Sequence, residues 1–266
     1  MRRLKSAVWF WIHRHRRNRA VARFALLCKN IHRASEHPLY DVNNNGERDV
    51  LARAVNGDAP VLFDVGANVG DWSAMAREIY PRAAIHAFKL NPKTAVLLAR
   101  RFSNISSVHV HSFGLAASSG EVNFFAYPGE SSVLSGLRVP LHSHVPHSIE
   151  RTNVRTGDEV CRELGVQQID FLKVDAESAD YEVLAGFSNT FKAQNVSAVQ
   201  FEHEGGRYLR DFYDFFEPKG YAIGKLYANY VDFRSHSSEM EHFLGPNYVA
   251  IPTSRKELIA RLQQGW

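Results

Sequence analysis

Short apolar runs alternate with amphipathic stretches from residue 60 to the C-terminal end of the chain. The run Val61–Val65 is apolar apart from Asp64, which is typical of a strand buried on both faces. The stretch Asp71–Ile79 has the spacing of an amphipathic helix. Further strands are expected over 83–88, 107–111, 122–127, 169–174, 196–201, 221–226 and 248–251, and further helices over 92–102, 157–165, 181–187 and 208–218. This alternation predicts an α/β fold with a doubly wound, mostly parallel sheet.

Two segments fall outside this alternation. Residues 2–33 have the pattern of one or two helices in which aromatic and aliphatic residues stand between basic ones, and a short helix is expected over 47–55. We therefore divide the chain into a basic helical segment, 1–55, and an α/β domain, 56–266. Residues 128–150 are rich in Ser, His, Pro and Gly and lack periodicity, so they predict a long loop of the kind that covers an active site.

Charge is distributed unevenly along the chain. Basic residues crowd the first 35 positions, which contain no acid, whereas the remainder is mildly acidic, so a general nucleic-acid surface is not expected. The basic segment admits two interpretations. Residues 1–33 could contact an anionic membrane peripherally. Alternatively, the helices could pack on the core and show a solvated basic face, which we favour because such faces are common.

Cysteine content and hydrophobic run length bear on the location of the protein. Cys28 and Cys161 provide neither a disulfide framework nor metal-ligand spacing. We interpret both as reduced thiols of a cytosolic protein. The early apolar run Ala7–Ile12 is far shorter than the roughly 20 residues that span a membrane, and it is short for a signal peptide.

Chemically distinctive residues occur where the predicted strands end. Gly66 and Gly70 follow the first strand and allow a sharp turn with close ligand approach, although an ordinary strand-to-helix turn has the same pattern. The ends of the other strands add more polar residues: Lys89, Asp175, Glu177, Glu202, His203 and Glu204. Because the carboxyl ends of parallel strands share one edge of a sheet, several acids would repel one another there without a ligand, cation or base among them.

Four blocks of sequence resemble the FkbM family of S-adenosylmethionine-dependent methyltransferases: Asp64–Gly70, Ala87–Pro92, Asp170–Glu177 and Glu182–Gly186. The glycine block alone is common to many methyltransferases, and its combination with the other blocks is more specific. The resemblance covers residues 60–251. It implies a seven-stranded Rossmann-like sheet with an antiparallel last strand, and O-methylation of sugar hydroxyls or natural products.

The resemblance also implies roles for individual residues. The cofactor S-adenosylmethionine would be bound by the following residues: Asp64, Gly66, Ala67, Asn68, Gly70, Phe88, Lys89 and Asp175. Asp175 would act beside the methyl donor as base, substrate orienter or ligand of a divalent cation shared with Glu202. Lys173 either takes part in the active site or forms a structural ion pair with a neighbouring carboxylate.

Histidines are the other candidate bases. His203 ends a strand where this fold often supplies catalytic groups, and its intrinsic pKa suits a base at neutral pH. His142, His144 and His147 in the long loop could contact substrate, although exposed loop polarity explains them equally well.

The chain departs from the family pattern at four positions. Lys89 stands where the family usually has a Glu that accepts hydrogen bonds from ribose, and lysine has no acceptor. Leu90 replaces a usual Pro, Gly157 a usual Leu and Ser178 a usual Gly.

The four resemblance blocks lead us to expect an O-methyltransferase acting on a glycan or small-molecule acceptor. The alternative is a degenerate, inactive relative that binds a glycan or protein partner. Binding of NADP ranks low because the full Gly-x-Gly-x-x-Gly turn is missing.

Overall fold

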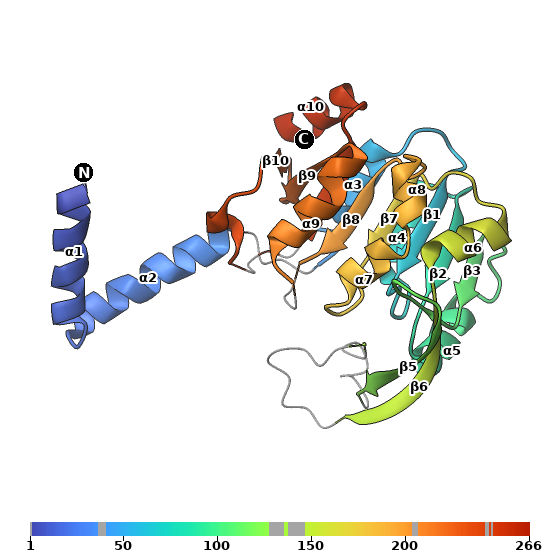
Figure 1. The fold of residues 1–266 in the computed structure, drawn as a ribbon, viewed down its shortest axis with the longest axis horizontal. Helices are drawn as coiled ribbons and strands as arrows, with labels where there is room; N and C mark the ends of the chain where they lie inside the picture. Colours follow the sequence, from blue (N-terminus) through green and yellow to red (C-terminus); the bar gives the residue numbers. More distant parts are fainter. Residues whose placement is uncertain are drawn as a thin grey trace. The chain divides into compact units, whose positions relative to one another are not determined.

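A computed structural model describes residues 2–36, 41–127, 136–137, 147–203, 207–242, 245 and 247–266 (Figure 1). The chain divides into two compact units, residues 1–39 and 40–266. The smaller unit contains α1 (Arg2–His15) and α2 (Arg19–Ser35). None of the residues of α2 is buried. No described helix is long and apolar enough to cross a membrane.

The larger unit is built on an eight-stranded sheet with the order β10-β9-β11-β8-β7-β1-β2-β3. Its strands are β1 (Val61–Val65), β2 (Ala84–Phe88), β3 (Val108–His111), β7 (Phe171–Val174), β8 (Val199–Glu202), β9 (Tyr221–Leu226), β10 (Val231–Phe233) and β11 (Asn247–Pro252). The five strands from β3 to β8 are parallel, and β11 runs antiparallel to both β8 and β9. The α/β class and the antiparallel last strand are confirmed. The sheet has eight strands instead of seven because the short β10 pairs with β9.

Helices cover both faces of this sheet (Figure 1). They are α3 (Glu47–Ala54), α4 (Asp71–Ile79), α5 (Pro92–Arg101), α6 (Gly157–Leu164), α7 (Asp180–Ala185), α8 (Ser188–Lys192), α9 (Leu209–Phe216) and α10 (Lys256–Gln264). Neighbouring strand residues point to opposite faces, so Phe63 and Leu172 join the core under α6–α9 while Leu62 and Phe171 join the core under α3, α4 and α10. Burial on both faces explains the continuous apolar runs of these strands. Helix α3, which we had grouped with the N-terminal segment, lies in the larger unit.

A second, three-stranded sheet has the order β4-β6-β5. It consists of β4 (Gly114–Leu115), β5 (Gly120–Ala126) and β6 (Ser148–Arg155). The strand expected over 122–127 therefore belongs to this sheet, and residues 148–150 belong to a strand instead of a loop. Strand β6 escaped detection because it contains few apolar residues and is exposed along much of its length. Most of the expected lid, residues 128–135 and 138–146, lies outside the described residues.

The unusual Gly157 has a packing explanation. A Cβ atom at Gly157 would lie 2.3 Å from the ring of Phe187, which is fully buried. The phenylalanine ring therefore occupies the space that a side chain at position 157 would need. This departure from the family pattern concerns the core under α6 and has no contact with a candidate site.

Three histidines pack together where β2 meets the edge strand β3. Nδ1 of His86 lies 3.1 Å from Nε2 of His111, and the rings of His86 and His109 stack 5.0 Å apart. The ring of His111 also stacks on Phe88 at 4.5 Å. Burial, together with the neighbouring histidines, lowers the pKa of both His86 and His111 to about 4. Both rings are therefore neutral in the folded protein at pH 7.

This cluster predicts that folding stability falls in mild acid. The unfolded chain takes up protons near the ordinary histidine pKa of about 6.5, whereas the folded chain resists them down to about pH 4. Stability is therefore full above pH 6.5 and declines as the pH falls towards 4, by about 3 kcal/mol for each of the two histidines. Urea unfolding between pH 4 and pH 7.5 measures this slope. The double variant His86→Phe/His111→Phe should flatten it, and an unchanged slope would refute the assignment.

Candidate active site

The glycine turn after β1 is fixed against two neighbouring strands. The backbone N–H groups of Gly66 and Ala67 both donate to the carbonyl oxygen of Phe88 at 3.0 Å. Gly66 has φ +88°, and a Cβ atom there would lie 1.7 Å from the carbonyl oxygen of Asp175. Gly70 has φ +91° and adjoins the ring of Phe102, which a Cβ atom would approach to 2.4 Å. Both positions therefore require glycine.

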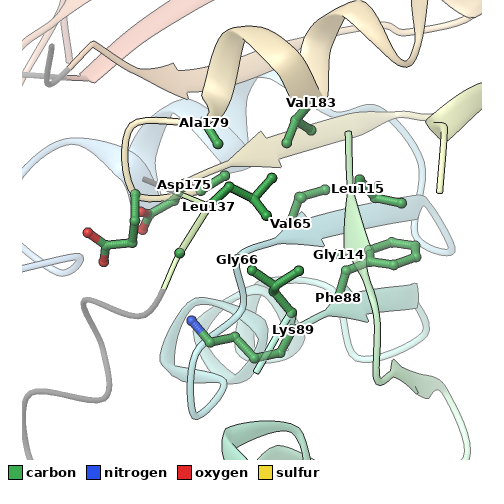
Figure 2. Close-up of a pocket in the computed structure, with 14 residues that line it drawn as sticks. Val65, Gly66, Phe88, Lys89, Gly114, Leu115, Leu137, Asp175, Ala179 and Val183 are labelled. Carbon is green, nitrogen blue, oxygen red and sulfur yellow. The ribbon is translucent and has the colours of Figure 1, made fainter. Parts of the chain in front are cut away.

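Two pockets meet at the contact between Gly66 and Asp175, and both residues line each pocket. The first pocket, which Figure 2 shows, has an apolar side formed by Phe88, Leu90 and Leu115. The second has a volume of about 550 Å³ and a polar lining. Its wall includes the turn before α3 and the first residue of that helix. These residues lie outside all four resemblance blocks: Asp41, Val42, Asn43 and Glu47.

Asp64 lies at the base of the second pocket and is fully buried. Its Oδ2 accepts a hydrogen bond from Oγ of Ser73 at 2.6 Å, whereas Oδ1 has no hydrogen-bond partner among the described residues. Burial raises the pKa of this carboxyl group, and the nearby Lys173 partly opposes the effect. A buried acceptor without a partner is costly, so this oxygen is suited to a ligand that donates a hydrogen bond.

Three other residues that line the second pocket also have a buried polar atom without a hydrogen-bond partner among the described residues. Glu47 Oε2, Asn68 Oδ1 and Trp72 Nε1 are buried and form no hydrogen bond within the part of the chain that the structure describes. Asn68 lines the pocket and adopts φ +48°, which is in the left-handed region. Glu47 is held by Asn45, whose Nδ2 donates to Glu47 Oε1 at 2.6 Å. The sequence did not identify Glu47 or Trp72, and only a three-dimensional contact with the motif reveals them.

Lys173 is a buried cation among these acids. Its Nζ lies 2.8 Å from Oδ2 of Asp175, and the lysine side chain is only 8% exposed. Burial alone would lower the pKa of Lys173, but the attraction of Asp175, Glu47 and Asp64 outweighs it and raises the pKa. The ion pair that we considered as the structural alternative is present, and it lies within the pocket wall.

Lys89 lies in the first pocket and is 4% exposed. Its side chain extends away from Phe88, and its ammonium group points towards the side on which Asp175 lies (Figure 2). Burial lowers the pKa of Lys89, while Asp175 and Glu177 act against this shift. Lys89 therefore places a hydrogen-bond donor where the family pattern has an acceptor. The neighbouring Leu90 packs against Gly114, where a Cβ atom would approach its Cδ1 to 2.4 Å.

Asp180 is a buried acid that sequence reasoning missed. Its Oδ1 accepts hydrogen bonds from the backbone N–H groups of Ala176 and Glu202, each at 3.4 Å. Burial raises the pKa of Asp180 well above the ordinary value, and the charge of Asp175 adds to the effect. Asp180 thus connects the end of β7 to the end of β8. Its position in the first turn of a helix just after the motif was the available signal.

Glu202 and His203 lie beside this assembly and line neither of the two pockets. His203 is 2% exposed, its ring packs edge-on against Phe212 and Tyr248, and Nε2 lies 3.0 Å from the carbonyl oxygen of Arg207. Burial lowers the pKa of His203.

His147 contacts the rings of Phe125 and Tyr127 on the second sheet and lines neither pocket. The remaining predicted polar residues lie outside the described residues: His142, His144 and Glu204.

The described side chains at the site do not support a binding site for a divalent cation. Within the described parts of the chain, no group of three or more His, Cys, Asp or Glu side chains could hold a metal ion. One carboxylate oxygen of Asp175 is occupied by Lys173. We therefore do not retain the cation that we considered between Asp175 and Glu202.

The doubly wound sheet, the glycine turn and the pockets at the carboxyl ends of β1, β2 and β7 define a Rossmann-like protein with a nucleotide-type site. The profile of the Methyltransferase FkbM domain matches residues 64–223, which is more than half of the chain. The chain belongs to the FkbM methyltransferase family, as its sequence blocks suggested.

Individual relatives match part of the chain. The hexuronic acid methyltransferase AglP of Haloferax volcanii is 27% identical over 163 residues, 58% of this chain and 62% of that protein. The 2-O-methyltransferase NoeI of Sinorhizobium fredii is 25% identical over 146 residues, 49% of this chain and 58% of that protein. A solved FkbM methyltransferase from Methylobacillus flagellatus has 15% identity and a TM-score of 0.48, and covers 73% of this chain and 44% of that one. The chain thus spans about three-fifths of the length of the two curated relatives.

Ser178 has a conformation that explains why glycine is usual there. Its φ is +70°, and the preceding Glu177 has φ +51°, so two successive non-glycine residues adopt the left-handed region. This conformation strains an L-residue by about 1–2 kcal/mol. The backbone after β7 therefore keeps its shape although the glycine is missing.

We predict that Ser178→Gly stabilises the fold by about 0.5–1 kcal/mol, because relief of strain exceeds the extra chain entropy of glycine. Chemical denaturation measures the change in the free energy of unfolding. Ser237→Gly is the matched control: Ser237 has φ −137°, so glycine relieves nothing there and should slightly destabilise the protein. Equal effects of the two substitutions would contradict the strain at Ser178.

Proposed function

We propose that this protein is an O-methyltransferase that uses S-adenosylmethionine to methylate a sugar hydroxyl of a glycan or glycosylated small molecule. The observation that supports this most strongly is the unpaired, buried Oδ1 of Asp64 beside the glycine turn. An acceptor of this kind fits the α-ammonium group at the methionine end of the cofactor. Glu47 and Asn68 contribute further unpaired acceptors to the same pocket.

The first pocket offers apolar residues to the remainder of the cofactor, although its volume of about 30 Å³ must increase before a purine can enter. Leu90, Leu115 and Leu137 provide apolar walls for a purine ring. The hydrogen-bond match is poorest at the ribose, because Lys89 can donate to the sugar oxygens but cannot accept from the hydroxyls. The residues therefore fit the methionine and adenine ends better than the ribose.

Asp175 is the residue that we assign to the acceptor hydroxyl. The bound cofactor supplies an electrophilic methyl group, and the hydroxyl oxygen must lose its proton as it gains that methyl. Lys173 binds Oδ2 of Asp175, while no described residue bonds to Oδ1, so Oδ1 is available to accept the proton. Asp175 lines both pockets, as a group between donor and acceptor should. Holding the reactants together contributes much of the rate in such a transfer.

The acceptor class rests on the relatives. Two of them bear the names hexuronic acid methyltransferase and 2-O-methyltransferase. We extend sugar hydroxyl methylation to this chain on that basis, and the polar lining of the second pocket is compatible with a sugar.

Replacement of Asp175 by Asn should reduce methyl transfer about 10²–10⁴-fold, because the amide cannot accept the hydroxyl proton. Transfer of radiolabelled methyl from S-adenosylmethionine to a panel of uronic-acid and neutral oligosaccharides measures this. Glu78→Gln is the matched control, since Glu78 lines the second pocket but pairs with Arg48 in a largely exposed position. Retention of full activity by Asp175→Asn would refute its role as base. Absence of transfer to every sugar by the native chain would refute the acceptor class.

Lys89 motivates the second candidate function, a methyltransferase fold that binds a glycan or protein partner without catalysis. Loss of hydrogen bonds to a charged acceptor costs about 1.5–3 kcal/mol, or roughly ten- to over a hundredfold in affinity. The two functions therefore differ in whether the native chain still binds the cofactor.

We predict that Lys89→Glu binds S-adenosylmethionine at least tenfold more tightly than the native chain, because the carboxylate restores the acceptor for ribose. Calorimetric titration measures both affinities. Lys93→Glu is the control, because Lys93 is an exposed neighbour that pairs with Glu150. Micromolar binding by the native chain supports the enzyme, whereas binding by Lys89→Glu alone supports the inactive relative. Equal affinities for native and Lys89→Glu protein would show that the ribose needs no acceptor at position 89.

A further inference from the structure

The two N-terminal helices display large apolar side chains to solvent. Among the described residues of α1 and α2, nine such side chains are exposed: Val8, Trp9, Phe10, Trp11, Ile12, Phe24, Leu26, Leu27 and Ile31. Trp9 is 78% exposed and Phe24 is 66% exposed. Large exposed apolar side chains in this number mark a site of interaction with a partner or a membrane.

Helix α2 separates apolar from basic residues around its axis. Phe24, Leu27 and Ile31 follow the three- and four-residue spacing that places them on one face. Arg19, Lys29 and Arg33 fall on the other side of the helix by the same geometry, and no residue of α2 is buried. Such a helix has one surface suited to hydrocarbon and another suited to anions.

The charge of this segment is one-sided. Residues 2–33 contain ten Lys or Arg, and the first 35 residues contain no acid. The rest of the chain has 22 Lys or Arg against 28 Asp or Glu, so the excess positive charge is confined to the helices with the exposed apolar residues. An anionic surface with an apolar interior complements both properties at once.

We propose that α1 and α2 bind the surface of an anionic lipid bilayer and lie in the plane of its interface. The helices contain 14 and 17 residues, or about 21 and 26 Å, which is shorter than the roughly 30 Å hydrocarbon core. Their apolar residues enter the acyl boundary while the arginines remain among the headgroups. Nucleic acid is the weaker match, because its bases can stack on tryptophan and phenylalanine but offer nothing to the exposed aliphatic side chains Ile12, Leu27 and Ile31. The proposal is independent of the enzymatic function.

Co-sedimentation of the full chain with lipid vesicles tests this surface. Vesicles of phosphatidylcholine with one-quarter phosphatidylglycerol should bind the protein at least tenfold more tightly than vesicles of phosphatidylcholine alone. High salt should weaken the binding. Arg19→Gln/Arg33→Gln should reduce it by about fivefold per removed charge. Equal binding to both vesicle types, or no binding to either, would overturn the proposal.

A matched pair of variants separates the apolar face from the rest of α2. Phe24→Ser/Ile31→Ser removes two members of the apolar face and should weaken vesicle binding at least tenfold. Leu26→Ser alters an equally exposed residue that lies on the basic side, and it should have little effect. Equal effects would refute the orientation of the helix. Binding of a short DNA duplex with the affinity expected for vesicles, without vesicle binding, would assign the segment to nucleic acid instead.

Discussion

The close approach of Gly66 to the carbonyl oxygen of Asp175 is the constraint on which the candidate site depends. It joins the turn after β1 to the end of β7, and any side chain at position 66 would collide with that carbonyl. The same turn is bound to β2 through the carbonyl oxygen of Phe88. Three strand ends are therefore fixed relative to one another, and the two pockets form on either side of the contact.

Electrostatics gives the two pockets different characters. In the second pocket the buried Lys173 faces Glu47, Asp64 and Asp175, and acceptor oxygens remain without partners among the described residues. In the first pocket Lys89 supplies a buried donor among apolar walls. A buried group without its partner is costly in an apolar surrounding, so both pockets are arranged for binding at the expense of folding stability. Asp175 lies between them and is the only charged residue that lines both within the described part of the chain.

Much of the fold could be predicted from the sequence, because strands buried on both faces have long apolar runs and their helices have clear periodicity. Strand β1 and its glycine turn were placed correctly for this reason. Strand β6 was not, because its largely exposed residues lack an alternating apolar pattern. Within the site, Asp64, Lys173 and Asp175 come together as their positions at adjacent strand ends required. Glu47 was missed because it is distant in sequence from the motif. His203 could be placed at a strand end, but the sequence did not show that its ring would pack against aromatic side chains such as Phe212.

Calorimetric titration with S-adenosylhomocysteine, performed on the native chain and on Asp64→Asn, tests the central claim most directly. The product retains the methionine ammonium group, so it probes the buried acceptor without turnover. We expect saturable binding at one site by the native chain and at least tenfold weaker binding by Asp64→Asn, with both proteins unfolding at similar denaturant concentrations. Equal affinity in the two proteins would contradict the role of Asp64 as the anchor of the site.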